Sequence, residues 1–150
     1  MLQSRGAASA QTKQVALAKP ISGGRLTDRG KNAGDGLRRH PVLAVEAVGA
    51  ARVVRLGGEI DLYNAAEVRA ALSEACAEAP EQIVVDLREV EFIDSTALGV
   101  LIETRSKLKN RDGFLLAAPG LETRRALEIS GLDKLFIVHD TVPDALGEKS

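Results

Sequence analysis

Beyond Pro41, the chain alternates between short β-branched apolar runs and longer segments whose apolar residues recur every three or four positions. Two strand-like runs come first, at residues 42–48 and 52–56, and Gly49-Ala50 between them predicts a hairpin. The helices predicted after the hairpin and the strands that follow them cover 65–79, 83–87, 90–93, 95–109, 114–117, 121–130, 135–138 and 141–146. This order predicts an α/β fold with a mixed, mostly parallel sheet of four to five strands and about four helices.

Residues that favour turns and helix ends mark the boundaries of these elements. Asn64 is predicted to cap the first helix and Pro80 to end it. Gly131 follows the third helix, where a glycine in the left-handed conformation commonly ends a helix. The stretch 57–61, Gly-Gly-Glu-Ile-Asp, is predicted to end the second strand in a loop. The apolar run at 83–87 predicts a strand that is covered on both faces.

Charge is unevenly divided along the 150-residue chain. Residues 1–40 carry eight Lys/Arg and two Asp, a net charge of +6, whereas residues 41–150 carry twelve Lys/Arg and nineteen Asp/Glu, a net charge of −7. The first 40 residues also hold six of the fourteen glycines and show no sustained hydrophobic period. We therefore predict a basic, Gly-rich, disordered leader over 1–41 and one folded domain over 42–150. A transit peptide and a functional basic arm are alternatives for the leader.

Composition excludes several classes of function. Only 3% of the residues are aromatic and none is Trp, which argues against a nucleic-acid platform that stacks bases on exposed rings. Cys76 is the single cysteine, so an intramolecular disulfide and a cysteine metal cluster are excluded. His40 and His139 lie far apart and match no metal-ligand spacing, and no apolar run approaches the ~20 residues of a membrane span. We expect a cytoplasmic protein without metal or cofactor.

The most informative segment is 92–100, Phe-Ile-Asp-Ser-Thr-Ala-Leu-Gly-Val, where a strand gives way to a helix. Asp94 or Ser95 is placed to cap the free N–H groups of that helix, and an ordinary cap is one interpretation. The other is a phosphorylatable hydroxyl, because the N-terminus of a helix favours the negative charge of a phosphate. The small residues Ala97 and Gly99 would then allow another protein to approach closely.

No catalytic constellation stands out. A nucleophilic serine would need a G-x-S-x-G elbow or a histidine base, and Ser95 has neither in its sequence context. Gly57-Gly58 lacks the G-K-[ST] continuation of a phosphate-binding loop. Acidic pairs such as Glu59 with Asp61 are explained more simply as solvated strand ends. We therefore predict a protein that is not an enzyme.

Three segments in this order resemble the STAS-domain anti-sigma factor antagonists of bacterial partner-switching systems. They are G-G-E-I-D-L-Y-N-A at 57–65, V-V-D-L-R-E-V-E-F-I-D-S-T-A-L-G-V-L at 84–101 and L-E-I-S-G-L-D-K-L-F at 127–136. The resemblance covers about 42–146, nearly all of the predicted domain.

The resemblance implies roles for individual residues. Ser95 matches the serine that a partner kinase phosphorylates, Asp94 precedes it as in the family, and Thr96 occupies the position of a second hydroxyl. Asp61 matches an acidic loop residue near the kinase-binding face. Together with Gly99, these residues form the predicted partner-binding site. Ala97 stands where many relatives have Gly, and the leader is longer than the family usually has.

The implied function is that of a phosphoprotein that regulates a sigma factor, and hence transcription, as in bacterial stress responses. Unphosphorylated, it would bind an anti-sigma factor that is also a serine kinase and so free the sigma factor; phosphorylation of Ser95 would weaken that complex. A serine phosphatase would reverse the modification. Direct binding of nucleic acid and a membrane span are not expected. A STAS subunit of a lipid ABC transporter or of a stressosome-like assembly is the alternative, and a small hydrolase built on Ser95 is a further one.

Overall fold

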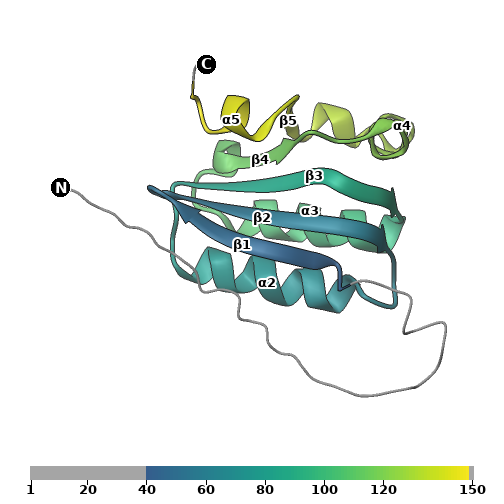
Figure 1. Ribbon diagram of the computed structural model, residues 1–150, viewed down its shortest axis with the longest axis horizontal. Helices are drawn as coiled ribbons and strands as arrows, with labels where there is room; N and C mark the ends of the chain where they lie inside the picture. Colours follow the sequence, from purple (N-terminus) through teal and green to yellow (C-terminus); the bar gives the residue numbers. More distant parts are fainter. Residues whose placement is uncertain (1–39, 149–150) are drawn as a thin grey trace.

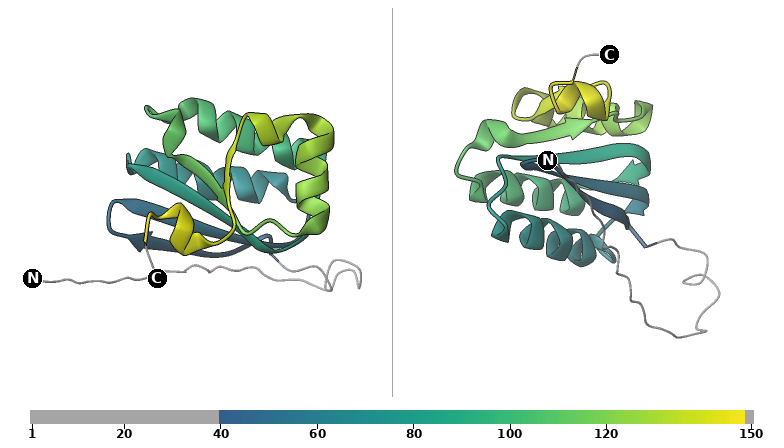
Figure 2. Two further views of the ribbon diagram at one scale, coloured as in Figure 1. Left: turned by 90° about the horizontal axis from the view of Figure 1, so that it is seen from above. Right: turned by 60° about the vertical axis from the view of Figure 1, so that its left-hand side comes forward.

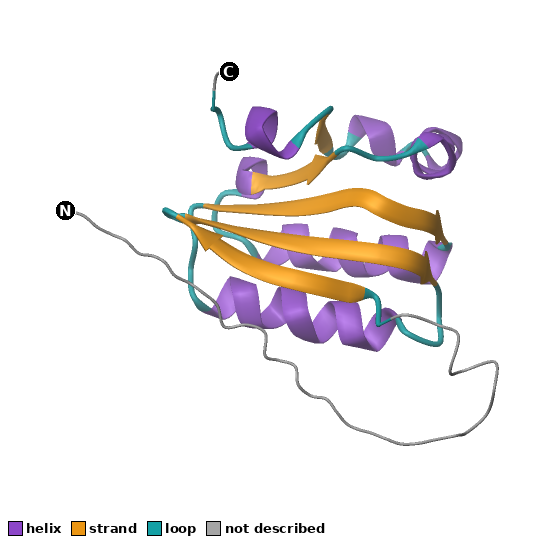
Figure 3. Cartoon of the chain, in the orientation of Figure 1, coloured by secondary structure: helices purple, strands orange, loops and turns teal. Residues whose placement is uncertain are grey.

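The computed structural model describes residues 40–148, and the predicted leader lies outside the described residues except for His40 and Pro41. Within the described range the chain forms one five-stranded sheet and four α-helices (Figures 1 and 3). The predicted α/β fold with a mixed, mostly parallel sheet is therefore confirmed. Its elements are β1 (Val42–Val48), β2 (Ala51–Ile60), α2 (Ala65–Ala77), β3 (Gln82–Ile93), α3 (Ser95–Lys107), η3 (Arg111–Gly113), β4 (Phe114–Ala117), α4 (Leu121–Ser130), η4 (Leu132–Lys134), β5 (Ile137–His139) and α5 (Val142–Ala145).

The strands lie in the sheet in the same order as in the sequence. β1 pairs antiparallel with β2, and β2, β3, β4 and β5 are parallel neighbours. Parallel crossovers are almost always right-handed, so crossovers that advance in one direction place their helices on one face. Figure 2 shows α2 and α3 together on one face of the sheet and α5 on the other.

Two apolar clusters fill the spaces on the two faces of the sheet. The larger lies beneath α2 and α3 and includes Leu72 of α2, Leu101 of α3 and the β3 residues Val85 and Leu87, all at most 1% exposed. The smaller joins Val84 on β3 to Ala145 on α5. β3 therefore contributes to both clusters, as the largely apolar run at 83–87 predicts.

Strand β2 is longer than the sequence indicates. The loop predicted at 57–61 is wrong for its first four residues, because β2 continues through Gly57 and Gly58 to Ile60. The β2–β3 register shifts between Arg55 and Gly57 and again after Gly58, which has a φ of +76°. Glycine adopts a positive φ without strain, so the strand can bulge at this point and resume its pairing with β3.

Helix α2 ends two residues earlier than predicted, at Ala77 rather than Ala79, because Ala79 has a φ of +54°. Asn64 stands at its N-cap position, but its side chain does not bond to the first turn of the helix. The predicted caps at Gly131, with a φ of +78°, and at Thr141, whose hydroxyl accepts from the N–H of Asp144, are both present.

The carboxyl ends of β2 and β3 lie at the same edge of the sheet, because the two strands are parallel. At this edge the loop at 61–64 connects β2 to α2, and Asp94 connects β3 to α3. Segments that are 30 residues apart in the sequence are thereby neighbours. Among residues 40–148, no helix has the length and apolar character needed to cross a bilayer.

Gly113 is the last residue of η3, directly before β4, and it lies where the connection after α3 packs closely against the segment before β3. A Cβ at this buried position would overlap the backbone oxygen of Glu81, so Gly113→Ala should lower the free energy of unfolding by about 1–3 kcal/mol. Gly99 is the matched control, because a Cβ there has nothing within 4 Å, and Gly99→Ala should raise stability by about 0.5–1 kcal/mol. Urea denaturation of the two variants measures both effects, and equal stabilities would contradict the expected clash.

Candidate functional site

Asp94 joins the start of α3 to the loop that precedes α2. Its Oδ1 accepts a hydrogen bond from the N–H of Ala97 at 3.0 Å, and its Oδ2 accepts one from the N–H of Leu62 at 3.1 Å. The N–H of Asp94 donates to the carbonyl of Ile60 at the end of β2, also at 3.0 Å. One residue thus caps a helix and fixes the neighbouring loop at the same edge of the sheet.

The loop itself is closed by hydrogen bonds from each of its backbone N–H groups. The N–H of Asp61 donates to Oδ1 of Asn64 at 2.9 Å, and that of Tyr63 donates to Oδ1 of Asp61 at 3.0 Å. The N–H groups of Asn64 and Ala65 both donate to the carbonyl of Asp61. With the bond from Leu62 to Asp94, five consecutive N–H donors have acceptors, so the backbone conformation of residues 61–65 is fixed.

Asn64 explains why a loop forms at this point. Its side chain uses both of its functions away from the helix, with Oδ1 accepting from Asp61 and Nδ2 donating to the carbonyl of Glu59 at 2.8 Å. Asn64 is only 8% exposed, so these bonds satisfy polar atoms that are largely removed from water. The predicted helix cap is therefore wrong in its chemistry, because Asn64 braces the loop instead.

Ser95, Thr96 and Gly99 are all exposed at the N-terminal part of α3. Ser95 and Gly99 are four residues apart and lie on the same face of the helix. Space beside Gly99 is open, since a Cβ built there meets no atom within 4 Å. Ala97 differs from the prediction: it is 1% exposed and belongs to the core, so it does not contribute to the accessible surface around Ser95.

The sequence left open whether Asp94 or Ser95 caps α3, and the structure assigns the cap to Asp94. Ser95 is the first residue of the helix. Its exposed hydroxyl stands at a helix end where the macrodipole is positive, and a negative group is favoured there.

The same edge exposes large apolar side chains to which none of the sequence motifs points. Tyr63 and Leu62 in the loop are 81% and 60% exposed, and Phe92 near the end of β3 is 51% exposed. In the sequence, Leu62 and Tyr63 stand between Asp61 and Asn64, two residue types that favour loops over helices. This setting is the signal that could have indicated an exposed apolar pair. Helical periodicity does not reveal it, because the pair precedes the first turn of α2.

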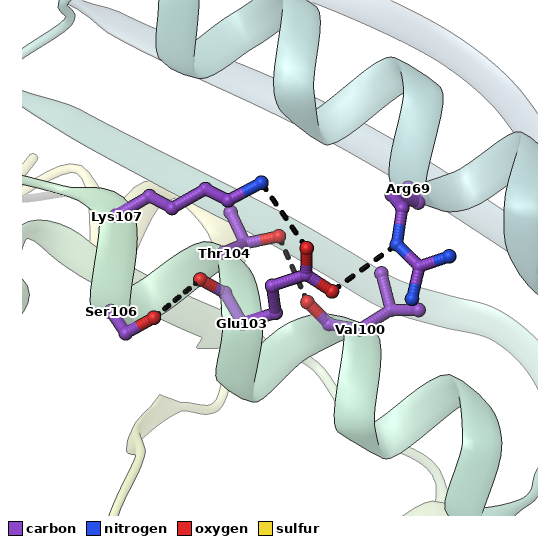
Figure 4. A network of polar contacts seen from close by, with 6 residues as sticks. All are labelled: Arg69, Val100, Glu103, Thr104, Ser106 and Lys107. Atoms are coloured by element: carbon purple, nitrogen blue, oxygen red, sulfur yellow. Dashed lines mark hydrogen bonds and ion pairs between the residues drawn. The ribbon is translucent and has the colours of Figure 1, made fainter.

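An ion network outside the loop links α3 to α2 (Figure 4). The Glu103 carboxylate lies 3.2 Å from Nζ of Lys107 on the same helix and 3.2 Å from Nε of Arg69 on α2. Hydrogen bonds from Lys107 first, and then from Arg69, hold the pKa of Glu103 below its ordinary value. The helix that carries Ser95 is thus tied to α2 at its far end and, through Asp94, to the loop before α2 at its near end.

No group of three or more His, Cys, Asp or Glu within 40–148 is arranged to hold a metal ion. Burial raises the pKa of the Cys76 thiol, with a smaller opposing effect from Lys107, and this favours the less reactive protonated form.

Comparison with known proteins gives one consistent family. The STAS domain family matches residues 43–145. The anti-sigma-F factor antagonist RsfB of Mycobacterium tuberculosis is 42% identical over 94 residues, which are 63% of this chain and 77% of the relative.

Solved structures agree with this match. An anti-sigma factor antagonist from Mycobacterium paratuberculosis has a TM-score of 0.65 and 39% sequence identity, covering 69% of this chain and 88% of the other. The Bacillus cell fate determinant SpoIIAA in its phosphorylated form has a TM-score of 0.54 and 26% identity, covering 69% and 95%.

Asp94→Ala removes the acceptor for two backbone N–H groups and should lower the free energy of unfolding by about 1–3 kcal/mol. Ser95→Ala is the matched control: it removes an exposed hydroxyl that is not the cap and should change stability by less than ~0.5 kcal/mol. Asp94→Asn, which keeps one carbonyl oxygen, should fall between them. Chemical denaturation provides the measurement, and equal losses for the two alanine variants would contradict this assignment.

Glu103 should make the stability of the link between α2 and α3 depend on pH. Because its pKa is lower in the folded chain, the contribution is complete above the unfolded value and is lost as pH falls through the folded pKa. Urea denaturation of wild type and Glu103→Gln between pH 3 and pH 7 should therefore show a stability difference that is constant near pH 7 and shrinks in acid. The difference should be small, since the pair is exposed. A difference that grows in acid would refute the assignment.

Proposed function

The chain belongs to the STAS domain family, as its three characteristic segments predict, and on this premise we propose that it is an anti-sigma factor antagonist controlled by phosphorylation of Ser95. Its unphosphorylated form binds an anti-sigma factor that is also a serine kinase, and the sigma factor held by that kinase is released. The observation that carries the proposal is the exposed Ser95 hydroxyl at the start of α3, beside the loop fastened by Asp94.

The names of the relatives support the regulatory class. Two relatives that are 42% and 39% identical to this chain over the aligned residues are named anti-sigma factor antagonists. The phosphorylated form of SpoIIAA supports phosphorylation as the control, because that protein shares the fold at 26% identity. Binding rather than catalysis is the activity proposed for this chain.

The proposed modification is an ordinary phosphoryl transfer. The Oγ of Ser95 attacks the γ-phosphorus of ATP bound to the kinase, the bond to the β,γ-bridging oxygen breaks, and ADP leaves. The hydroxyl proton is released to a base of the kinase. Oγ then carries a phosphate with a charge of about −1.5 to −2 near neutral pH. A serine phosphatase hydrolyses this ester and restores the binding form.

The accessible face around Ser95 explains how such a group weakens a complex. Gly99 lies one helical turn further on the same face and leaves open space, so a partner backbone can approach closely. Asp61 and Asp94 already place carboxylates at this edge. A phosphate on Ser95 adds both bulk and further negative charge to a contact from which water is excluded. Thr96 lies beside Ser95 and belongs to the same proposed face.

Phosphorylation with the purified anti-sigma factor kinase of the source organism and ATP tests the proposal. Mass spectrometry should find one phosphate on the wild type, none on Ser95→Ala, and one on Thr96→Ala. Ser95→Asp adds only one charge and fewer acceptor oxygens, so it should weaken binding less than phosphorylation does. Ser95→Ala should remain bound and keep the sigma factor free. Peptide mapping that placed the phosphate on Thr96, with Ser95→Ala still fully labelled, would overturn the assignment.

A pull-down from the source organism separates this function from its alternatives. Capture of a small serine kinase together with release of a sigma factor supports it, whereas capture of a permease indicates the lipid-transporter alternative. A large assembly of STAS proteins indicates the stressosome-like one. A cytoplasmic location accompanies the proposed function, because sigma factors act on RNA polymerase there.

A further inference from the structure

The loop at 61–64 holds two large apolar side chains in solvent. Tyr63 is 81% exposed and Leu62 is 60% exposed, although each contains enough apolar area to favour burial. Single exposed apolar residues are common on protein surfaces. What distinguishes this pair is the polar network that prevents it from turning inward.

Every N–H group from residue 61 to residue 65 donates a hydrogen bond inside the described part of the chain. The acceptors include the side chains of Asp61, Asn64 and Asp94. A change of backbone conformation that turned Leu62 or Tyr63 toward the core would require several of these bonds to break. The loop therefore presents both side chains in one preorganised conformation, and a partner that covers them has little backbone to order.

The pair lies beside the proposed switch. The N–H of Leu62 is 3.1 Å from Oδ2 of Asp94, the residue directly before Ser95. A partner that contacts the Ser95 hydroxyl therefore also reaches the loop. The switch residues themselves offer little apolar area, because Ser95, Thr96 and Gly99 are all small. Most of the apolar surface for a stable contact must come from neighbouring side chains, and tyrosine is among the residues that most often dominate binding.

We propose that Leu62 and Tyr63 form the apolar anchor of the partner interface and insert into an apolar pocket of the anti-sigma factor kinase. This inference rests on the proposed function and deepens it by naming the side chains that carry the affinity. Ser95 then controls a contact whose strength is supplied by its neighbours. The sequence of this loop becomes a determinant of which kinase the chain recognises.

Binding is measured with the purified kinase and the full chain in a Ser95→Ala background, so that phosphorylation does not interfere. Tyr63→Ser and Leu62→Ser should each raise the Kd at least tenfold. Tyr63→Phe keeps the ring and should stay within about threefold of the parent, because the apolar area rather than the hydroxyl is the anchor. Thermal unfolding of each variant checks that the domain remains folded.

Val48→Ser provides the matched control. Val48 is a partly exposed apolar residue that pairs with Ala51 at the start of β2, the opposite end of the strand that leads to the loop. Its substitution should leave the Kd within about twofold. If the Ser95→Ala chain binds and Tyr63→Ser binds equally well, the anchor is refuted while the proposed function stands. If the Ser95→Ala chain does not bind at all, the proposed function fails and the anchor with it. If Tyr63→Ser changes only self-association, the occupant is a second copy, and the proposal is overturned.

Discussion

The two oxygens of Asp94 hold together the parts of the molecule that matter for recognition. Oδ1 caps the N-terminus of α3, and Oδ2 accepts a hydrogen bond from the loop that precedes α2. A carboxylate is suited to this task because it accepts several hydrogen bonds and is favoured by the positive end of a helix. The exposed hydroxyl of Ser95 and the apolar loop consequently occupy fixed positions relative to each other, although 30 residues separate them along the chain.

Much of the architecture was predictable because it depends on periodicity. The run at 83–87 is apolar at nearly every position, and it forms the strand that serves both cores. Gly131 and Thr141 act as predicted, since a left-handed glycine and a capping hydroxyl depend on local backbone geometry alone. These features require no knowledge of what lies on the other side of the sheet.

The errors arise where hydrogen bonds or packing with residues outside a helix or strand override the local preference of its sequence. Gly57 and Gly58 favour a turn locally, yet their pairing with β3 extends the strand through them. Asn64 is a good helix cap in isolation, but its two bonds to the preceding loop use both of its polar atoms. Ala97 was expected to border the surface site, and only the packing of α3 on the sheet reveals that it faces inward. For the exposed pair at 62 and 63, the deciding contact comes from Asp94.

The agreement between strand order and chain order has a consequence for how the domain assembles during synthesis. Each strand after the first pairs with the strand made immediately before it, so no strand must wait for a distant partner. The sheet can therefore grow by successive addition at one edge as the polypeptide emerges, and each addition closes only the crossover that joins two consecutive strands. The loop at 61–64 meets Asp94 as soon as β3 is in place. The hydrogen bonds that shape the recognition edge all join residues that precede β4 in the chain.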